Sequence, residues 1–159
     1  MKLSVVITTR NEESNIANCI RAFDAFRDEV EIIVVDNAST DRTKDIAIEM
    51  GAKVFDKGPE RSAQRNLGWQ TAMADWVVIL DADMMLPKET IEEILERTSA
   101  EPVVADAFWI PEVRTGSGIR VKARNFERSF YDGTAIDALR LFSRSLFRLK
   151  FFRPPRFSP

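Results

Sequence analysis

The feature that most constrains the fold is a repeated alternation of apolar, β-branched runs with segments of helical periodicity. The runs predict buried strands. They occupy residues 2–9, 30–36, 52–56 and 75–83, with a further strand expected at 102–110 and an edge strand after the turn at 114–122. After the first run, Ile16, Ile20 and Phe23 fall at i, i+4 and i+7 of a helix. Strands that alternate with helices indicate a mostly parallel sheet with helices on both faces, so the sequence predicts an α/β protein.

Composition limits the chemistry available to this chain of 159 residues. It contains no histidine, so acid–base chemistry depends on carboxylates, lysine or tyrosine, which excludes serine–histidine triads and histidine-rich zinc sites. Cys19 is the single cysteine, and its place beside an apolar helical stripe predicts a core residue. No secretory signal and no run of about 20 apolar residues is visible, so we expect a cytoplasmic location.

Charge is distributed unevenly along the chain. Residues 1–113 hold 12 basic and 22 acidic residues, whereas residues 114–159 hold 11 basic and 3 acidic residues. We expect the basic part to contact the inner face of a membrane or a second subunit of a homo-oligomer. The alternative is that its arginines simply flank the acidic part. No nucleic-acid partner is expected.

Polar and acidic residues follow the first, second and fourth predicted strands, in the segments "TRNEES", "DNAST" and "DAD". In parallel sheets, ligands bind beyond the carboxyl ends of the strands, so these segments predict one shared site. Asp81 and Asp83 alternate, and in an extended strand their side chains would point the same way. Such oxygen ligands suit Mg²⁺ or Mn²⁺, although an acidic turn at a strand end is the simpler alternative. The first loop has no glycine and excludes a dinucleotide fingerprint.

Three segments in the same order resemble the inverting family 2 glycosyltransferases of the GT-A fold. They are "SVVITTRNEESNI", "IIVVDNASTDRT" and "GPERSAQRNLGWQTAMADWVVILDAD", and the resemblance continues weakly through "DALRLFSRSLFR". It implies a Rossmann-like three-layer α/β/α sandwich over residues 1–150. Within it, residues 1–113 would form the donor half and 114–150 the start of the acceptor half, before an irregular basic tail at 151–159.

The resemblance also implies a reaction and its residues. A sugar would pass with inversion from a nucleotide diphosphate, most simply a UDP-sugar, to a saccharide or lipid-linked acceptor of cell-envelope synthesis, with Mn²⁺ or Mg²⁺. Asp36 would read the base, Arg65 would approach the diphosphate, and Asp81 would lie near the ribose. The implied donor-binding residues are Thr8, Thr9, Glu12, Asp36, Arg61, Arg65 and Asp81, and the implied metal ligand is Asp83. The simpler alternatives are a capping turn at Asp36 and a solvated helix face at the two arginines.

The sequence departs from the family at the catalytic base, which the family usually carries in an acidic motif late in the domain. No acidic residue follows Asp137, so the chain is expected to be truncated before that motif. The candidates by location alone are Asp106, Glu112, Asp132 and Asp137. The alternative function is therefore an inactive nucleotide-binding or interaction module. A sugar nucleotidyltransferase would need a glycine- and arginine-rich first loop, which is absent here.

Overall fold

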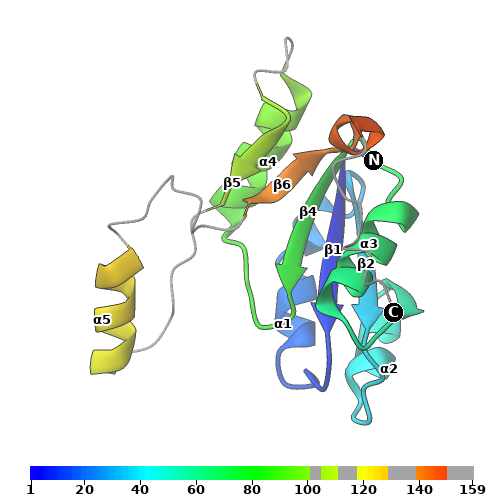
Figure 1. The fold of residues 1–159 in the computed structure, drawn as a ribbon, viewed down its shortest axis with the longest axis vertical. Coiled ribbons are helices and arrows are strands. Elements are labelled where there is room, and N and C mark those ends of the chain that lie inside the picture. The colour runs from blue at the N-terminus through cyan, green and yellow to red at the C-terminus, as the bar shows by residue number, and fades with distance from the viewer. Residues whose placement is uncertain (101–104, 111–117, 129–138, 150–159) are drawn as a thin grey trace, which may run out of the picture.

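A six-stranded sheet lies at the centre of the computed structural model, which describes residues 1–100, 105–110, 118–128 and 139–149 (Figure 1). Its order is β3-β2-β1-β4-β6-β5. The strands are β1 (Leu3–Thr9), β2 (Val30–Asp36), β3 (Lys53–Asp56), β4 (Trp76–Asp81), β5 (Ala107–Trp109) and β6 (Leu139–Ser143). The first four are parallel, and β6 pairs antiparallel with both β4 and β5. The sheet confirms the predicted α/β class.

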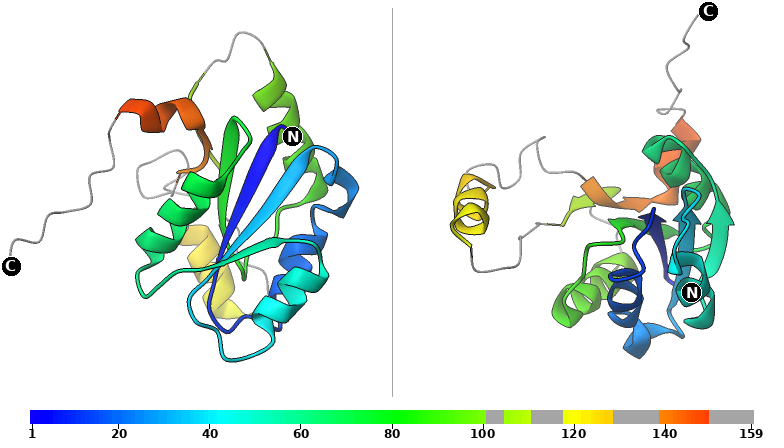
Figure 2. Two further views of the ribbon diagram at one scale, coloured as in Figure 1. Left: turned by 90° about the vertical axis from the view of Figure 1, so that its right-hand side faces the viewer. Right: turned by 90° about the horizontal axis from the view of Figure 1, so that it is seen from below.

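Helices cover both faces of this sheet. The α-helices are α1 (Ile16–Arg21), α2 (Thr43–Glu49), α3 (Arg61–Thr71), α4 (Lys88–Ser99) and α5 (Ile119–Arg128), and the 3₁₀ segments are η1 (Asp24–Phe26) and η2 (Arg144–Leu149). Side chains of α1 and α4 pack with one face of the sheet, and those of α3 pack with the other. Figure 2 shows this three-layer arrangement. Among the described residues, no helix has both the length and the apolar character needed to cross a membrane.

The central strands are buried on both faces, which explains their nearly continuous apolar sequences. Val5 and Ile7 of β1 point toward α1 and α4, whereas Val6 points toward α3. Gly68 allows α3 to lie close to β1, because a Cβ atom at this position would come within 2.2 Å of Val6 Cγ1. The height of α3 above the sheet is therefore fixed by the absence of a side chain at position 68.

The parallel strands begin at one end of the sheet, called the amino edge below, and end at the other, called the carboxyl edge. The amino edge contains a buried carboxylate, Glu31, which is 5% exposed. Its Oε1 accepts hydrogen bonds from the Ser4 hydroxyl and the Met73 backbone N–H, and its Oε2 accepts one from Lys53 Nζ at 2.9 Å. Burial opposes ionisation, but the hydrogen bonds from Ser4, Lys53 and Met73 outweigh it and lower the pKa of Glu31. This carboxylate ties three strands to the segment that precedes β4.

One element differs from its sequence-based prediction. The segment after the turn at 114–122 was expected to form an edge strand, but residues 119–128 form helix α5. Ile119, Ala123 and Phe126 follow a helical spacing, and the arginines, lysine, alanine and glutamate between them favour a helix. The strand expected at 102–110 is seen as β5, over Ala107–Trp109. The tail at 151–159 lies outside the described residues.

Candidate functional site

The carboxyl ends of β1, β2 and β4 bring the predicted site residues together. In the register of the sheet, Thr8 pairs with Asp81 of β4, and Thr9 pairs with Asp36 of β2. This juxtaposition follows from the parallel order β2-β1-β4, in which three strands end at the same edge. The fold therefore brings together the strand-end residues that the sequence predicted for one site.

The loops after β1 and β2 are joined by hydrogen bonds. The Asn11 backbone N–H donates to Ser39 Oγ at 2.8 Å, and the Thr40 N–H donates to Asn11 Oδ1 at 2.8 Å. The Glu12 N–H donates to Thr43 Oγ1 at 2.7 Å. Asn11 and Ala38 have φ angles of 53° and 51°, in the left-handed region that few residues with a side chain adopt. The two loops thus form one preorganised wall.

Asp36 lies fully buried at the base of this wall. Its carboxylate accepts hydrogen bonds from the backbone N–H and the hydroxyl of Ser39, so it has the turn-forming role that the simpler alternative described. The Thr9 hydroxyl beside it is also buried and has no hydrogen-bond partner in the described part of the chain. Glu12 lies further out, where its Oε2 accepts a hydrogen bond from Asn15 Nδ2 at 2.7 Å.

Asp81 is the electrostatic centre of the site. Its Oδ1 accepts a hydrogen bond from Thr8 Oγ1 at 2.8 Å and lies 3.3 Å from an Arg65 guanidinium nitrogen. Its Oδ2 lies 3.8 Å from Arg61. The arginines are four residues apart at the start of α3, so they share one helix face directed at the end of β4. Arg65 is about two-thirds buried, so a solvated helix face does not describe it, whereas Arg61 is 69% exposed.

Gln64 holds α3 in this position, and sequence reasoning missed it. It is 4% exposed, and its Nε2 donates to the backbone oxygens of Thr9 at 3.1 Å and Val35 at 2.8 Å. The side chain therefore attaches the arginine-bearing helix directly to the ends of β1 and β2. The only signal in the sequence is a polar residue on the sheet-facing side of α3, between the two arginines.

A hollow of about 670 Å³ opens beside Asp36, at the ends of β2 and β3. Its wall includes Asn37, Lys44 and the Gly58–Pro59 turn. Asn37 Nδ2 donates to the Pro59 backbone oxygen at 3.1 Å, and a Cβ atom at Gly58 would collide with the Asn37 side chain. The loop before α3 is thus fitted closely against the loop after β2, and this hollow was not predicted from the sequence.

Contrary to the sequence prediction, Asp83 does not lie on an extended strand with Asp81. Strand β4 ends at Asp81, and the Met84 N–H donates to the Asp81 backbone oxygen at 2.9 Å, so Asp83 lies in a turn and not on an extended strand. Its side chain is exposed and makes no hydrogen bond or ion pair with the described residues. Cys19 lies buried in α1 near this turn, which confirms its predicted core position. Its burial, with a smaller effect of the Asp83 and Asp81 charges, raises the pKa of the Cys19 thiol to about 12.

The described residues contain no group of three or more side chains able to hold a metal ion alone. Mg²⁺ and Mn²⁺ at phosphate sites usually take one or two carboxylates and complete their shell with phosphate oxygens and water. A free, exposed carboxylate at Asp83, next to the arginine-paired Asp81, fits that donor set. The residues present are therefore compatible with a divalent cation held jointly with a ligand.

The structure does not bring Asp106 to this site. The Ser143 N–H donates to the Asp106 backbone oxygen at 2.7 Å, and Ser143 pairs with Trp76, the first residue of β4. Asp106 therefore lies near the amino end of β4, about 16 Å along the strand direction from Asp81 at its other end. Its Oδ1 accepts a hydrogen bond from the Ser145 hydroxyl at 3.1 Å. The other candidates, Glu112, Asp132 and Asp137, lie outside the described residues.

The mostly parallel sheet, its helical layers and the polar carboxyl edge define the GT-A architecture of glycosyltransferases. A sequence model described as glycosyl transferase family 2 matches residues 4–157, so the chain belongs to this family. The resemblance found in the three sequence segments is thereby confirmed.

Relatives of known sequence agree with this assignment. An uncharacterized glycosyltransferase of Rickettsia typhi is 43% identical over 95 residues, which cover 58% of this chain and 32% of that protein. A dolichol-phosphate mannosyltransferase of Pyrococcus furiosus is 35% identical over 104 residues, covering 60% of this chain and 30% of that protein. The chain thus spans about a third of the length of these relatives.

Solved structures show the same fold. The S. aureus TarS fragment 1–349 has a TM-score of 0.76 at 21% identity, covering 100% of this chain and 52% of that one. Its complex with UDP-GlcNAc matches at 30% identity with a TM-score of 0.54, covering 60% and 30%. Glucosyl-3-phosphoglycerate synthase from Mycobacterium tuberculosis, in complex with Mn²⁺, UDP and glucosyl-3-phosphoglycerate, gives 0.65 at 23% identity, covering 91% and 57%.

Proposed function

We propose that this domain binds a nucleotide-diphosphate sugar, with a UDP-sugar as the favoured donor, and transfers the sugar with inversion to a saccharide or lipid-linked hydroxyl. The observation that carries the proposal is the cluster of Thr8, Asp81 and Arg65 beside the free carboxylate of Asp83, at the carboxyl edge of the sheet. Family membership and similarity to a UDP-GlcNAc complex support this assignment. In this scheme, residues 1–113 form the donor half and residues 114–150 begin the acceptor half.

The nucleoside would occupy the wall formed by the loops after β1 and β2. The hollow beside Asp36 has room for a planar base. Thr9 and Glu12 lie at and just after the end of β1, the strand between β2 and β4. The buried Thr9 hydroxyl has no partner in the described residues, so it can bond a polar ligand without first losing a protein contact. Asp36 would act through its unused lone pairs and through the loop that it holds in place.

The diphosphate would lie between α3 and the turn that contains Asp83. Arg65 and Arg61 supply positive charge on one side, and Thr8 and Arg65 fix the Asp81 carboxylate near the ribose. Asp83 would hold Mn²⁺ or Mg²⁺, which supplies electrostatic stabilisation of the leaving nucleotide diphosphate. The arginines add to that stabilisation because they are already oriented before the ligand binds.

Inversion also needs a carboxylate on the acceptor side to remove a proton from the incoming hydroxyl. Asp106 is unsuited, since it lies at the amino edge of the sheet. Asp132 and Asp137, in the acceptor half, remain candidates. Because the described residues place no base beside Asp83, nucleotide binding without transfer is the second candidate function.

Calorimetric titration with UDP, in the presence and absence of Mn²⁺, tests the donor site. We expect Mn²⁺ to tighten UDP binding, and Asp83→Asn to remove most of that gain without changing the unfolding temperature. The matched control is Asp28→Asn, an exposed acid at the amino edge, which should behave as wild type. Unchanged Mn²⁺-dependent binding in Asp83→Asn would overturn the metal role, and tight GDP binding without UDP binding would overturn the base assignment.

A transfer assay separates the two candidate functions. Wild-type protein is incubated with UDP-sugars, Mn²⁺ and simple saccharide or polyprenyl-phosphate acceptors, and release of UDP is measured. Release that depends on the acceptor supports the transferase. Retained UDP binding with no release above background favours the binding module.

A further inference from the structure

Helix α5 (Ile119–Arg128) differs from the other described helices in where its apolar side chains lie. In Figures 1 and 2 it stands apart from the layers that cover the sheet. Ile119 is 84% exposed and Phe126 is 68% exposed. With Ala123, which is also exposed, they are spaced i, i+4 and i+7 and form a stripe along one side of the helix.

Single exposed apolar residues are common on soluble proteins and need no explanation. Ile48 on α2, which is 60% exposed, is such a case, because its helix buries Thr43 and Ala47 against the body of the protein. The α5 stripe is different, since two large apolar side chains lie on the same ten-residue helix and both are more exposed than Ile48. The stripe therefore forms an exposed apolar face on α5.

The charge of α5 indicates the chemistry of that partner. Residues 118–128 carry four basic side chains and one acidic side chain, a net charge of +3, and Lys122 is exposed. Residues 1–113 carry a net charge of −10, so the positive charge is local to this end of the chain. An apolar stripe on a basic helix is typical of helices that lie in the headgroup region of an anionic bilayer.

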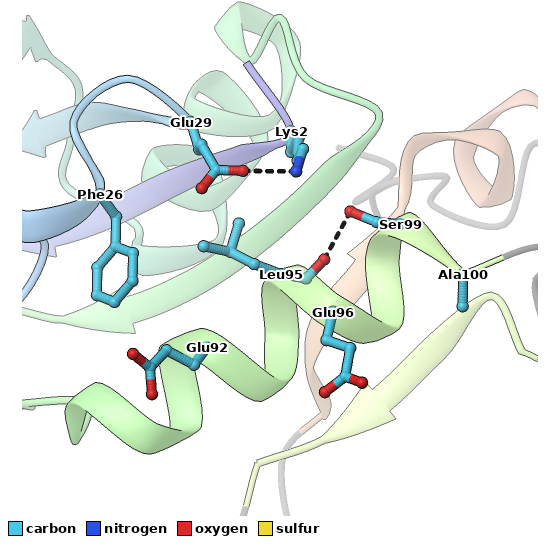
Figure 3. A pocket seen from close by; sticks show the side chains of 8 residues that line it. All are labelled: Lys2, Phe26, Glu29, Glu92, Leu95, Glu96, Ser99 and Ala100. Carbon is cyan, nitrogen blue, oxygen red and sulfur yellow. Dashed lines mark hydrogen bonds and ion pairs between the residues drawn. The ribbon is translucent and has the colours of Figure 1, made fainter.

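The opposite end of the molecule has no comparable basic apolar helix among the described residues. A hollow of about 450 Å³ at the amino edge of the sheet, drawn in Figure 3, has Phe26 and Leu95 among its walls. Its charged lining residues are Lys2, which is ion-paired with Glu29, together with Glu92 and Glu96. Figure 1 places α5 toward the end of the sheet to which β1, β2 and β4 point.

We propose that α5 is an interfacial helix that docks this domain on an anionic lipid surface. Ile119 and Phe126 enter the boundary between headgroups and acyl chains, while Lys122 remains at the level of the lipid phosphates. Docking in this orientation brings the carboxyl edge, with Asp81 and Asp83, to the membrane side. The proposal concerns the surface alone and stands whether or not the domain binds a nucleotide.

The test is vesicle sedimentation with the full chain and no nucleotide. Wild-type protein should bind vesicles of phosphatidylglycerol and phosphatidylcholine, bind vesicles of phosphatidylcholine alone much more weakly, and lose affinity as salt rises. Replacing both anchors, in Ile119→Asp with Phe126→Asp, should lower affinity for the anionic vesicles on the order of 100-fold. Lys122→Glu should lower it on the order of tenfold.

The control is Ile48→Asp, which changes an exposed isoleucine elsewhere and should bind as wild type. Circular dichroism and the unfolding temperature of each variant establish that the sheet remains folded. Absence of binding to the anionic vesicles by folded wild-type protein overturns the proposal, as does equal binding by the double variant. A wild-type dimer that the double variant converts to a monomer, without any vesicle binding, would assign the stripe to a second copy of the chain instead.

Discussion

The two ends of the same sheet use carboxylates in opposite ways. At the amino edge, Glu31 receives hydrogen bonds from Ser4, Lys53 and the Met73 backbone, all from the surrounding strands and loop. At the carboxyl edge, Asp81 receives its bonds from Thr8 and from Arg65, while Asp83 two residues later makes none within the described chain. At the amino edge, the hydrogen bonds of the carboxylate are made within the protein. The carboxyl edge retains charged groups that a ligand can use.

This difference predicts which substitutions change the stability of the protein and which change ligand binding. The Glu31 partners are fixed by backbone and strand positions, so their loss affects folding. The arginine partners of Asp81 are carried by α3, which depends on Gln64 and on close contact with β1 for its position. Substitutions at the amino edge should therefore change the free energy of unfolding, and substitutions at the carboxyl edge should change nucleotide affinity.

The largest effect is expected at the amino edge. Glu31→Ala leaves the Ser4 hydroxyl and the Met73 N–H without their acceptor and should lower the free energy of unfolding by about 3 kcal/mol. Affinity for UDP should remain that of wild type. Urea unfolding and calorimetry measure the two quantities. Glu49→Ala, which removes an exposed acid, should cost less than about 0.5 kcal/mol, and an equal loss in both variants would contradict the structural role of Glu31.

Two glycine substitutions test whether the position of α3 determines nucleotide affinity. Gly68→Ala places a methyl group against Val6 and should cost about 2 kcal/mol of stability, and because it lifts α3 it should also weaken UDP binding. Gly51→Ala, at the end of α2, has open space but a φ of 79°, so it should cost about 1 kcal/mol and leave UDP binding unchanged. The same measurements apply. Equal UDP affinity in the two variants would show that the height of α3 does not matter for the site.

A smaller effect is expected from an arginine at the carboxyl edge. Arg65→Gln should lower UDP affinity about tenfold, or about 1.4 kcal/mol, because a preorganised positive charge beside the diphosphate is lost. The free energy of unfolding should change much less than in Glu31→Ala. Arg27→Gln removes an arginine paired with Asp24 near the amino edge and should bind UDP as wild type. Comparable losses of affinity in both variants would indicate a general effect of charge and not a local one.

The smallest effect is a pH dependence at the amino edge. The pKa of Glu31 is lowered from its ordinary value of 4.5, so its ionised form stabilises the folded state. The stability difference between wild type and Glu31→Gln should be fully present above pH 4.5 and should disappear as the pH falls through the lower pKa of the folded protein. Urea midpoints of both proteins over this range measure it. A difference that grows toward acid pH would reverse the sign and contradict the lowered pKa.

Much of the fold was predictable because the central strands are buried on both faces and their sequences are almost purely apolar. The carboxyl-edge rule then placed Thr9, Asp36 and Asp81 at one site without any knowledge of distances. The role of Gln64 was not predictable, since its acceptors are backbone oxygens on two strands distant in sequence. The turn at Asp83 was missed because a strand that ends at Asp81 and one that ends at Asp83 have the same apolar pattern.

Helix α5 shows a second limit of sequence reasoning. The glycines at 116 and 118 and the short apolar spacing after them suggested a turn and an edge strand. The helical spacing of Ile119, Ala123 and Phe126 was present in the same residues. Periodicity alone does not distinguish the two in a ten-residue segment.

Cys19 offers a direct way to time the motions of the site. It is the single cysteine of the chain, it is 1% exposed, and its thiol has a pKa of about 12, so a thiol reagent at neutral pH reacts only when α1 separates from the sheet. The labelling rate of the natural protein then reports the opening equilibrium of the helix beneath Asp83. A ligand that closes the site would slow the reaction, and it would do so without any engineered probe.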